Sequence, residues 1–274
     1  MSPSWRNRVS IALYPERVVW LRVPRGLIPR VEHKGEIHVE TDAAVPWRGP
    51  LQGLDQALAA AGATGASLSI LLSNRLVRYA LTPNPDSAGN RDELDLMVRH
   101  VFERTHGDVA SGWDIRLSDS APGRPALASA IDREFLQAMR ELARKHRCRL
   151  GAVRPYLMAA YNRLTPARRA GSGAFMMLEP GRLCQLAWKE GGWCAVQQTH
   201  AGHDWPQQLQ PWMERFAVQA TIAPETPLQF CAPEFGNLAI PEGSRRFDPL
   251  LPHWLHGLSP THDQAYAGAM LGLV

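Results

Sequence analysis

The sequence of 274 residues predicts a duplicated α/β fold with two subdomains and a cleft between them. The first indication is a motif that occurs twice: residues 13–21, LYPERVVWL, are echoed by residues 178–186, LEPGRLCQL. Each copy lies between apolar runs, the pattern of a strand, a tight turn at a proline and a second strand. The second indication is the order of three strands, a helix and a strand in both halves, which is typical of α/β layers. A widely spaced repeat of this kind favours two related halves over a short-period solenoid.

The first half begins with the apolar alternation of three strands. The helix that follows carries Leu51, Leu54 and Leu58 on one face, and Gly62 is well placed to end it. Asp92 is a candidate cap for a second, strongly periodic helix, and Asp132 for a third. In order, we expect strands at 9–14, 18–23 and 36–41, a helix at 51–61, a pair of neighbouring strands at 68–73 and 76–81 before Pro83, a helix from residue 92, strands at 113–117 and 126–131, a helix from residue 132, a short strand at 151–153 and a helix from Pro155 to Leu164.

Residues 165–173, TPARRAGSG, mark the clearest boundary, and the strand pattern restarts after them. The last helix opens with a capping box, Thr261 to Gln264, and has a small-residue face that suits close packing on the first half. The predicted domains are residues 1–170 with a small insertion at about 107–132, completed by helix 261–274, and residues 171–260. The second half should contain strands at 174–178, 183–188 and 193–198, a helix at 205–220 and a strand at 228–232.

Composition is that of an ordinary globular protein, with 45% hydrophobic and 20% charged residues. No run of 18 apolar residues suggests a membrane span, and the N-terminus does not resemble a signal peptide, so we expect a cytoplasmic protein. The net charge of +4 comes from dispersed cations, which does not favour nucleic-acid binding. The four cysteines lack CxxC spacing and should be reduced thiols.

Motifs that carry chemistry are weak in this sequence. His200 and His203 are spaced as metal ligands can be, but a surface turn is the favoured interpretation, and no metal site is predicted. No phosphate-binding P-loop, dinucleotide fingerprint or nucleophile elbow occurs, so no catalytic residue is assigned.

Several stretches, taken in order, resemble the actin-like (ASKHA) superfamily. The matching stretches are residues 69–83, residues 128–134 leading to 150–159, residues 174–202 and the small-residue helix at 264–273. More narrowly, the chain is similar to PilM-type proteins of type IV pilus assembly and to the cytoplasmic domain of GspL in type II secretion. The resemblance implies a duplicated RNase H-like fold.

The hairpin turns depart from the superfamily pattern. In nucleotide-binding members each turn has Asp-x-Gly, in which Asp holds the metal and Gly lets the backbone approach phosphate. Tyr14 and Glu16 stand at these positions in the first copy, and Glu179 and Gly181 in the second. The expected Gly-Gly adenosine turn is replaced by residues 233–236, PEFG. Because a carboxylate about 4 Å from a phosphate repels it by about 1 to 4 kcal/mol, we expect a vestigial nucleotide site and no cofactor.

The resemblance implies a non-catalytic cytoplasmic scaffold, peripheral to the inner membrane and without direct insertion into it. Its partner would be the cytoplasmic tail of a single-pass protein of PilN type, added along the sheet edge of the first half beneath residues 113–132. Candidate contacts are Leu71, Arg75, Arg78 and Tyr79. A homodimer is left open.

Two alternatives stay open from the sequence. One is an active actin-like ATPase or small-molecule kinase, with Glu179 in place of the metal-binding Asp and with ATP and Mg²⁺ as cofactors. The other is an unrelated protein-interaction module whose two hairpins are coincidental.

Overall fold

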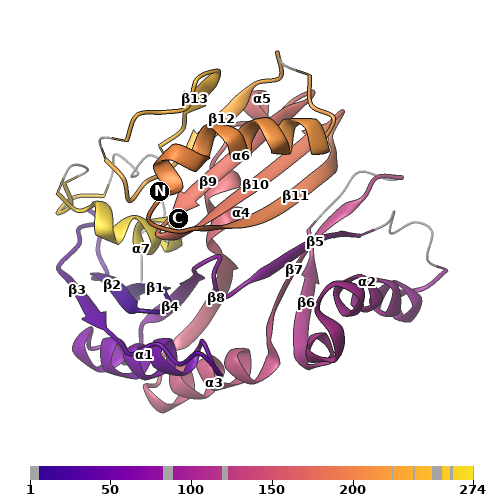
Figure 1. Ribbon diagram of the computed structural model, residues 1–274. Helices are drawn as coiled ribbons and strands as arrows, with labels where there is room; N and C mark the ends of the chain where they lie inside the picture. The colour runs from indigo at the N-terminus through magenta and orange to yellow at the C-terminus, as the bar shows by residue number, and fades with distance from the viewer. Residues whose placement is uncertain are drawn as a thin grey trace.

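The computed structural model describes residues 6–82, 89–118, 123–223, 225–236, 238–248, 255–259 and 262–273, and the strands described there form three sheets (Figure 1). The first sheet has the order β3-β2-β1-β4-β8 and the second has the order β11-β10-β9-β12-β13. The third, smaller sheet has the order β5-β7-β6. The strands of the first sheet are β1 (Arg8–Leu13), β2 (Arg17–Val23), β3 (His33–His38), β4 (Ser67–Leu72) and β8 (Arg149–Pro155); those of the second are β9 (Gly173–Glu179), β10 (Gly181–Lys189), β11 (Gly192–Ala201), β12 (Leu228–Cys231) and β13 (Ser244–Arg246); those of the third are β5 (Arg78–Thr82), β6 (Trp113–Leu117) and β7 (Ala126–Asp132).

The two large sheets repeat one topology, as predicted. In each, three antiparallel strands are followed by a crossing helix and by a strand that pairs in parallel with the first strand of its half. Leu13 pairs with Val18 in the first hairpin and Leu178 pairs with Leu183 in the second, so Pro15 and Pro180 occupy equivalent turns. The two hairpins are therefore equivalent elements of one repeated topology, which argues against the interpretation that their likeness is coincidental.

The helices cover the sheets in layers (Figure 1). Helices α1 and α3 lie on one face of the first sheet, while α6 lies on the outer face of the second. Alternate residues of β9 therefore join different cores: Phe175 packs toward the first half, and Met176 packs under α6. Both faces are covered, which explains why β9 is buried along its whole length. The helices are α1 (Arg48–Ala60), α2 (Arg91–His106), α3 (Arg133–Lys145), α4 (Tyr156–Tyr161), α5 (Pro166–Arg169), α6 (Trp205–Gln219) and α7 (Ala267–Gly272), with short 3-10 turns at Gly107–Gly112 and Gln264–Tyr266.

The small residues of α7 bring this helix against β1 and β4 of the first sheet. A Cβ atom on Gly268 would lie 2.5 Å from the Tyr14 hydroxyl, and one on Gly272 would lie 2.1 Å from Ser10 Oγ. Neither distance is compatible with a side chain, so glycine is required for the observed approach. The expected packing of the last helix on the first half is confirmed.

Strands 68–73 and 76–81 were expected to pair, and this prediction is wrong. β4 belongs to the first sheet, whereas β5 belongs to the small sheet. The side chains of Ser73 and Asn74 are fully buried between them and form tertiary hydrogen bonds, which direct the chain away from a hairpin. The inserted unit is consequently larger than residues 107–132, because it also contains β5 and α2 around a core of its own.

Two helix starts also differ from the expectation. Asn90, and not Asp92, caps α2: its side chain accepts a hydrogen bond from the Glu93 backbone N–H at 3.0 Å. The last helix is shorter than predicted, beginning with a 3-10 turn at Gln264, and Thr261 of the expected capping box lies outside the described residues, as does Pro83. β3 begins three residues early, at His33; its polar, largely exposed residues give little alternation to locate it.

Candidate functional site: the junction of the two hairpins

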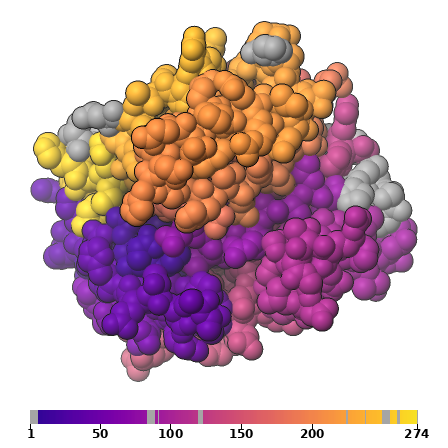
Figure 2. Space-filling model, viewed as in Figure 1, coloured from indigo at the N-terminus to yellow at the C-terminus, as the bar shows by residue number. Residues whose placement is uncertain are grey.

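The two hairpin turns meet residues of the opposite half where the halves are in contact. In Figure 2 the orange atoms of the second half rest directly on the indigo and magenta atoms of the first half. Tyr14, at the end of β1, donates its hydroxyl to Glu234 Oε1 at 2.8 Å. Arg17, at the start of β2, forms an ion pair with the other oxygen of the same carboxylate. The first hairpin is thus bound to the turn after β12, where the superfamily pattern places the adenosine turn.

Burial governs the electrostatics of this contact. The Glu234 side chain is only 3% exposed, and removal from water raises its pKa to about 7 although Arg17 opposes the shift. Burial also raises the pKa of Tyr14 well above its usual value, with the Glu234 carboxylate adding to the shift. The Arg17 guanidinium lies 4.7 Å from the Tyr14 ring centroid, so one cation contacts both partners.

Glu179, the acidic residue of the second hairpin, is fully buried. Ser73, which follows β4 in the first half, donates its hydroxyl to Glu179 Oε1 at 3.1 Å. Burial, with the nearby Glu234 charge, raises the pKa of Glu179 to about 8, and the Ser73 hydrogen bond lowers it only in part. At neutral pH this carboxyl is therefore mostly protonated, and a neutral acid is a poor ligand for a divalent cation.

Arg75 joins the two turns directly. Its Nη1 atom lies 2.5 Å from Glu16 Oε2, and its side chain passes across Gly181, where an added Cβ would lie 3.4 Å from the guanidinium carbon. Gly181 has φ of +80°, a conformation that suits glycine and opens the tight second turn. The four residues singled out from the sequence, Tyr14, Glu16, Glu179 and Gly181, thus share one junction.

Sequence reasoning missed the partners of these residues. The sequence marks Glu234 only as part of a departure from the expected Gly-Gly turn, and it assigns no partner to Arg17. The repeated motif has an arginine after each turn, Arg17 and Arg182, and this shared residue type was a sequence signal for a functional position. Only the fold shows that Arg17 finds a carboxylate 217 positions away.

The residues proposed for partner binding lie mostly inside the protein. Leu71 is fully buried in β4, and Tyr79 is 8% exposed with its hydroxyl bonded to Asn74 Oδ1 at 2.7 Å. Arg78 donates to the backbone carbonyls of Arg75 and Val77. Their role in binding stays a prediction, but in this structure Leu71 and Tyr79 do not line an open surface.

A groove does lie at the sheet edge where a tail was expected, between β8 and the inserted small sheet. β8 is an edge strand of the first sheet and β6 is an edge strand of the third. The groove has a volume of about 340 Å³, and Arg116 and Arg140 lie on its rim. Its other lining residues are Leu72, Asp114, Ser129, Ile131, Leu136, Leu150, Gly151, Ala152, Val153 and Pro155.

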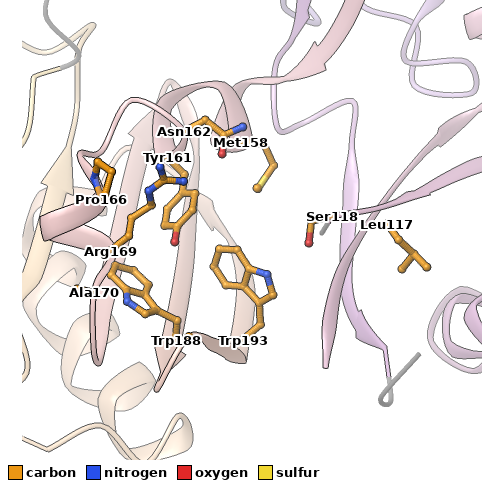
Figure 3. A pocket seen from close by; sticks show the side chains of 11 residues that line it. Leu117, Ser118, Met158, Tyr161, Asn162, Pro166, Arg169, Ala170, Trp188 and Trp193 are labelled. Atoms are coloured by element: carbon orange, nitrogen blue, oxygen red, sulfur yellow. The ribbon is translucent and has the colours of Figure 1, made fainter. Parts of the chain in front are cut away.

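A second cavity, of about 740 Å³, lies at the far end of the β10–β11 hairpin (Figure 3). Figure 3 shows Tyr161, Trp188 and Trp193 gathered on one wall, with Leu117 and Ser118 opposite. The Tyr161 ring is 5.5 Å from that of Trp188 and 4.9 Å from that of Trp193. The aromatic rings contact one another and thereby join the two halves on the side away from Pro180. Within the described ranges, no group of three or more His, Cys, Asp or Glu side chains could hold a metal ion.

No family model matches the chain, and no curated protein matches it by sequence. Solved structures match its fold. A chain of the PilM-PilN type IV pilus biogenesis complex superposes with a TM-score of 0.61 at 11% identity, covering 97% of this chain and 97% of that one. The cytoplasmic domain of EpsL, an inner-membrane component of the type II secretion system of Vibrio cholerae, gives a TM-score of 0.57 at 14% identity, covering 97% and 92%.

A protein of Bacteroides thetaiotaomicron with an actin-like ATPase fold and unknown function gives a TM-score of 0.55 at 10% identity, covering 86% of this chain and 84% of that one. Identities this low establish the fold rather than the activity. The α-helices described here include none that is long and apolar enough to cross a membrane. Together with the duplicated sheets and their equivalent hairpins, these matches show that the chain has the actin-like fold that its sequence resembles.

Proposed function

We propose that this protein is a non-catalytic actin-like scaffold on the cytoplasmic side of an inner-membrane assembly platform, of a type IV pilus or a type II secretion system. We further propose that it binds the cytoplasmic tail of a PilN-type membrane protein. Support for this setting comes from the fold shared with the EpsL domain and with the PilM-PilN complex, whose names place them in such systems.

The single observation that carries the non-catalytic part is the link from Tyr14 and Arg17 to Glu234. An actin-like ATPase needs backbone N–H groups and a metal-binding carboxylate free to face phosphate between its two hairpins. Here that position holds a tyrosine hydroxyl, an arginine and a buried carboxylate that satisfy one another. Glu16 forms an ion pair with Arg75, so this guanidinium is already bound to a carboxylate and is not free to bind a polyphosphate.

The groove between β8 and β6 is the proposed site for the partner tail. Two edge strands flank it, and an extended peptide can pair with an edge strand while its side chains enter adjacent pockets. Apolar residues make up most of the lining, and of the two arginines Arg116 is paired with Asp114 at 3.0 Å, so Arg140 is the main positive charge that favours an acidic residue in an otherwise apolar tail. The location matches the sheet edge expected from the sequence, although the lining residues differ from those named there.

Fluorescence anisotropy with a labelled peptide tests this site, using the cytoplasmic tail of the PilN-type protein encoded in the same genome. The double variant Arg116→Glu with Arg140→Glu reverses the rim charge and should weaken binding by about tenfold or more, which corresponds to about 1.4 kcal/mol. Arg245→Glu, an exposed arginine on β13 of the second half, is the matched control and should leave affinity unchanged. Equal affinities for all three proteins, or no binding by the unmodified chain, would refute the groove as the docking site.

A further inference from the structure

A loop between β2 and β3 presents two adjacent apolar side chains to solvent. Leu27 is 82% exposed and Ile28 is 72% exposed. Among the large apolar side chains that the described residues leave exposed, these are the only two that are neighbours in sequence. Isolated exposed apolar residues need no explanation, but a contiguous pair at a loop tip indicates contact with another surface.

The base of this loop is fixed, so the tip is held outward. On one side the Arg25 N–H donates to Asn7 Oδ1 at 3.0 Å. On the other side the chain bonds to residue 256 through both backbone groups, with the His256 N–H donating to the Pro29 carbonyl at 3.1 Å and the Val31 N–H donating to the His256 carbonyl at 2.8 Å. The base of the loop is therefore ordered by hydrogen bonds to two distant segments of the chain.

Positive charge surrounds the apolar tip. Arg25 and Arg30 flank it directly and are both exposed. The nearest acidic residue along the chain, Glu32, already lies 3.9 Å from the Arg22 guanidinium. The local surface is therefore cationic at its base and apolar at its point, the arrangement of a peripheral contact with an anionic lipid surface.

We propose that the loop of residues 25–30 rests on an anionic membrane surface, with Leu27 and Ile28 entering the boundary between headgroups and acyl chains. A lipid surface fits better than a protein partner, because two side chains at a convex tip offer neither a pocket nor the area that a specific protein interface buries. Lipid requires no complementary shape, and anionic headgroups match the two arginines. The contact is interfacial and shallow, and it departs from the expectation of no direct insertion only by these two side chains, without a membrane span.

Cosedimentation of the full chain with vesicles tests the proposal. Vesicles of phosphatidylglycerol and phosphatidylethanolamine should retain the protein, and vesicles of phosphatidylcholine should retain much less. Leu27→Gln with Ile28→Gln should lower the partition coefficient by about tenfold or more, because it removes the apolar contact. Val218→Gln, which alters a side chain 81% exposed on α6, is the matched control and should bind as the unmodified chain does.

The charge contribution is separable from the apolar one. Arg25→Gln with Arg30→Gln should weaken binding and flatten its salt dependence, since fewer cations face the headgroups. Unchanged melting temperatures would show that all variants remain folded, as expected for exposed positions. Failure of the unmodified chain to sediment, as would occur if the loop docked a protein instead, would overturn the proposal, and so would equal binding of the Leu27 and Ile28 double variant.

Discussion

The two hairpins share a backbone path but hold different chemistry. In the first, Tyr14 and Arg17 of the N-terminal half reach across to Glu234 of the second half. In the second, Glu179 reaches back to Ser73 of the N-terminal half. The register around Pro15 and Pro180 is the same, so the two hairpins have the same strand geometry although the residues at their turns differ.

The two hairpins show two ways in which side chains can bind the halves together at a position that faces a ligand in nucleotide-binding members of the superfamily. The first hairpin uses a largely buried ion pair between Arg17 and Glu234, whereas the second uses Glu179, a buried acid that is mostly neutral at pH 7. Each hairpin is bonded to the opposite half, so the side chains at both turns already have partners within the protein. We therefore expect variants at the two turns to affect stability unequally.

The largest effect should come from Arg17→Ala measured at pH 8. In the unmodified protein Glu234 is then mostly ionised; without Arg17 this buried carboxyl must either keep a charge that has lost its cation or take up a proton, and either should lower the free energy of unfolding by about 3 kcal/mol. Arg182→Ala alters the equivalent position of the second hairpin, where no ion pair of comparable geometry is seen among the described residues, and should cost less than about 1 kcal/mol. Urea denaturation gives the free energy of unfolding of both variants. Equal losses of stability would show that the two hairpins do not differ in this respect.

A smaller effect is expected from Gly268→Leu in α7, the helix that packs on the first sheet. The leucine side chain would clash with the Tyr14 hydroxyl and with Ala12, since a Cβ there already lies 2.5 Å and 3.0 Å from them. Overpacking should lower the free energy of unfolding by roughly 1 to 3 kcal/mol. Gly112→Leu, at a position where a Cβ meets nothing within 4 Å, is the control. Identical denaturation midpoints for the two variants would mean that α7 does not pack as described.

The last comparison concerns the slope of stability against pH, and it tests the buried acid of the second turn. The pKa of Glu179 rises from 4.5 to about 8 on folding, so the folded state holds a proton that the unfolded state has lost between these values. Stability should therefore fall as pH rises from about 5 to 8. Glu179→Gln cannot take up or release this proton, so it should remove most of that fall. Parallel stability profiles for Glu179→Gln and the unmodified chain would show that Glu179 is not a buried neutral acid.

Local patterns predicted much of this fold. Alternating apolar residues and the prolines at 15 and 180 were sufficient for the hairpins, and the glycines of α7 for its close packing. The same local reasoning paired 68–73 with 76–81, because two apolar runs with a short connection look like a hairpin. Asn74 decides otherwise by accepting hydrogen bonds from the Leu157 N–H and the Tyr79 hydroxyl, and Leu157 is 83 positions away.

The candidate site was predictable only in part for the same reason. The turns themselves were visible as a repeat, and the departures at Tyr14 and Glu16 could be seen against the superfamily pattern. The partners were not visible, since Glu234 lies 220 positions from Tyr14 and no periodicity connects them. The groove residues come from β4, β6, β7, α3 and β8, which no local window contains together.

Isothermal titration of the unmodified protein with Mg-ATP tests the central claim most directly. If the link from Tyr14 and Arg17 to Glu234 occupies the position of the phosphates, millimolar Mg-ATP should give no saturable heat and no rise in melting temperature. Tyr14→Asp with Glu16→Gly restores a metal ligand and removes a repelling carboxylate, and weak binding by that variant would be consistent with the account. Saturable micromolar binding by the unmodified chain, with hydrolysis that is lost in Glu179→Ala, would contradict it and establish an ATPase instead.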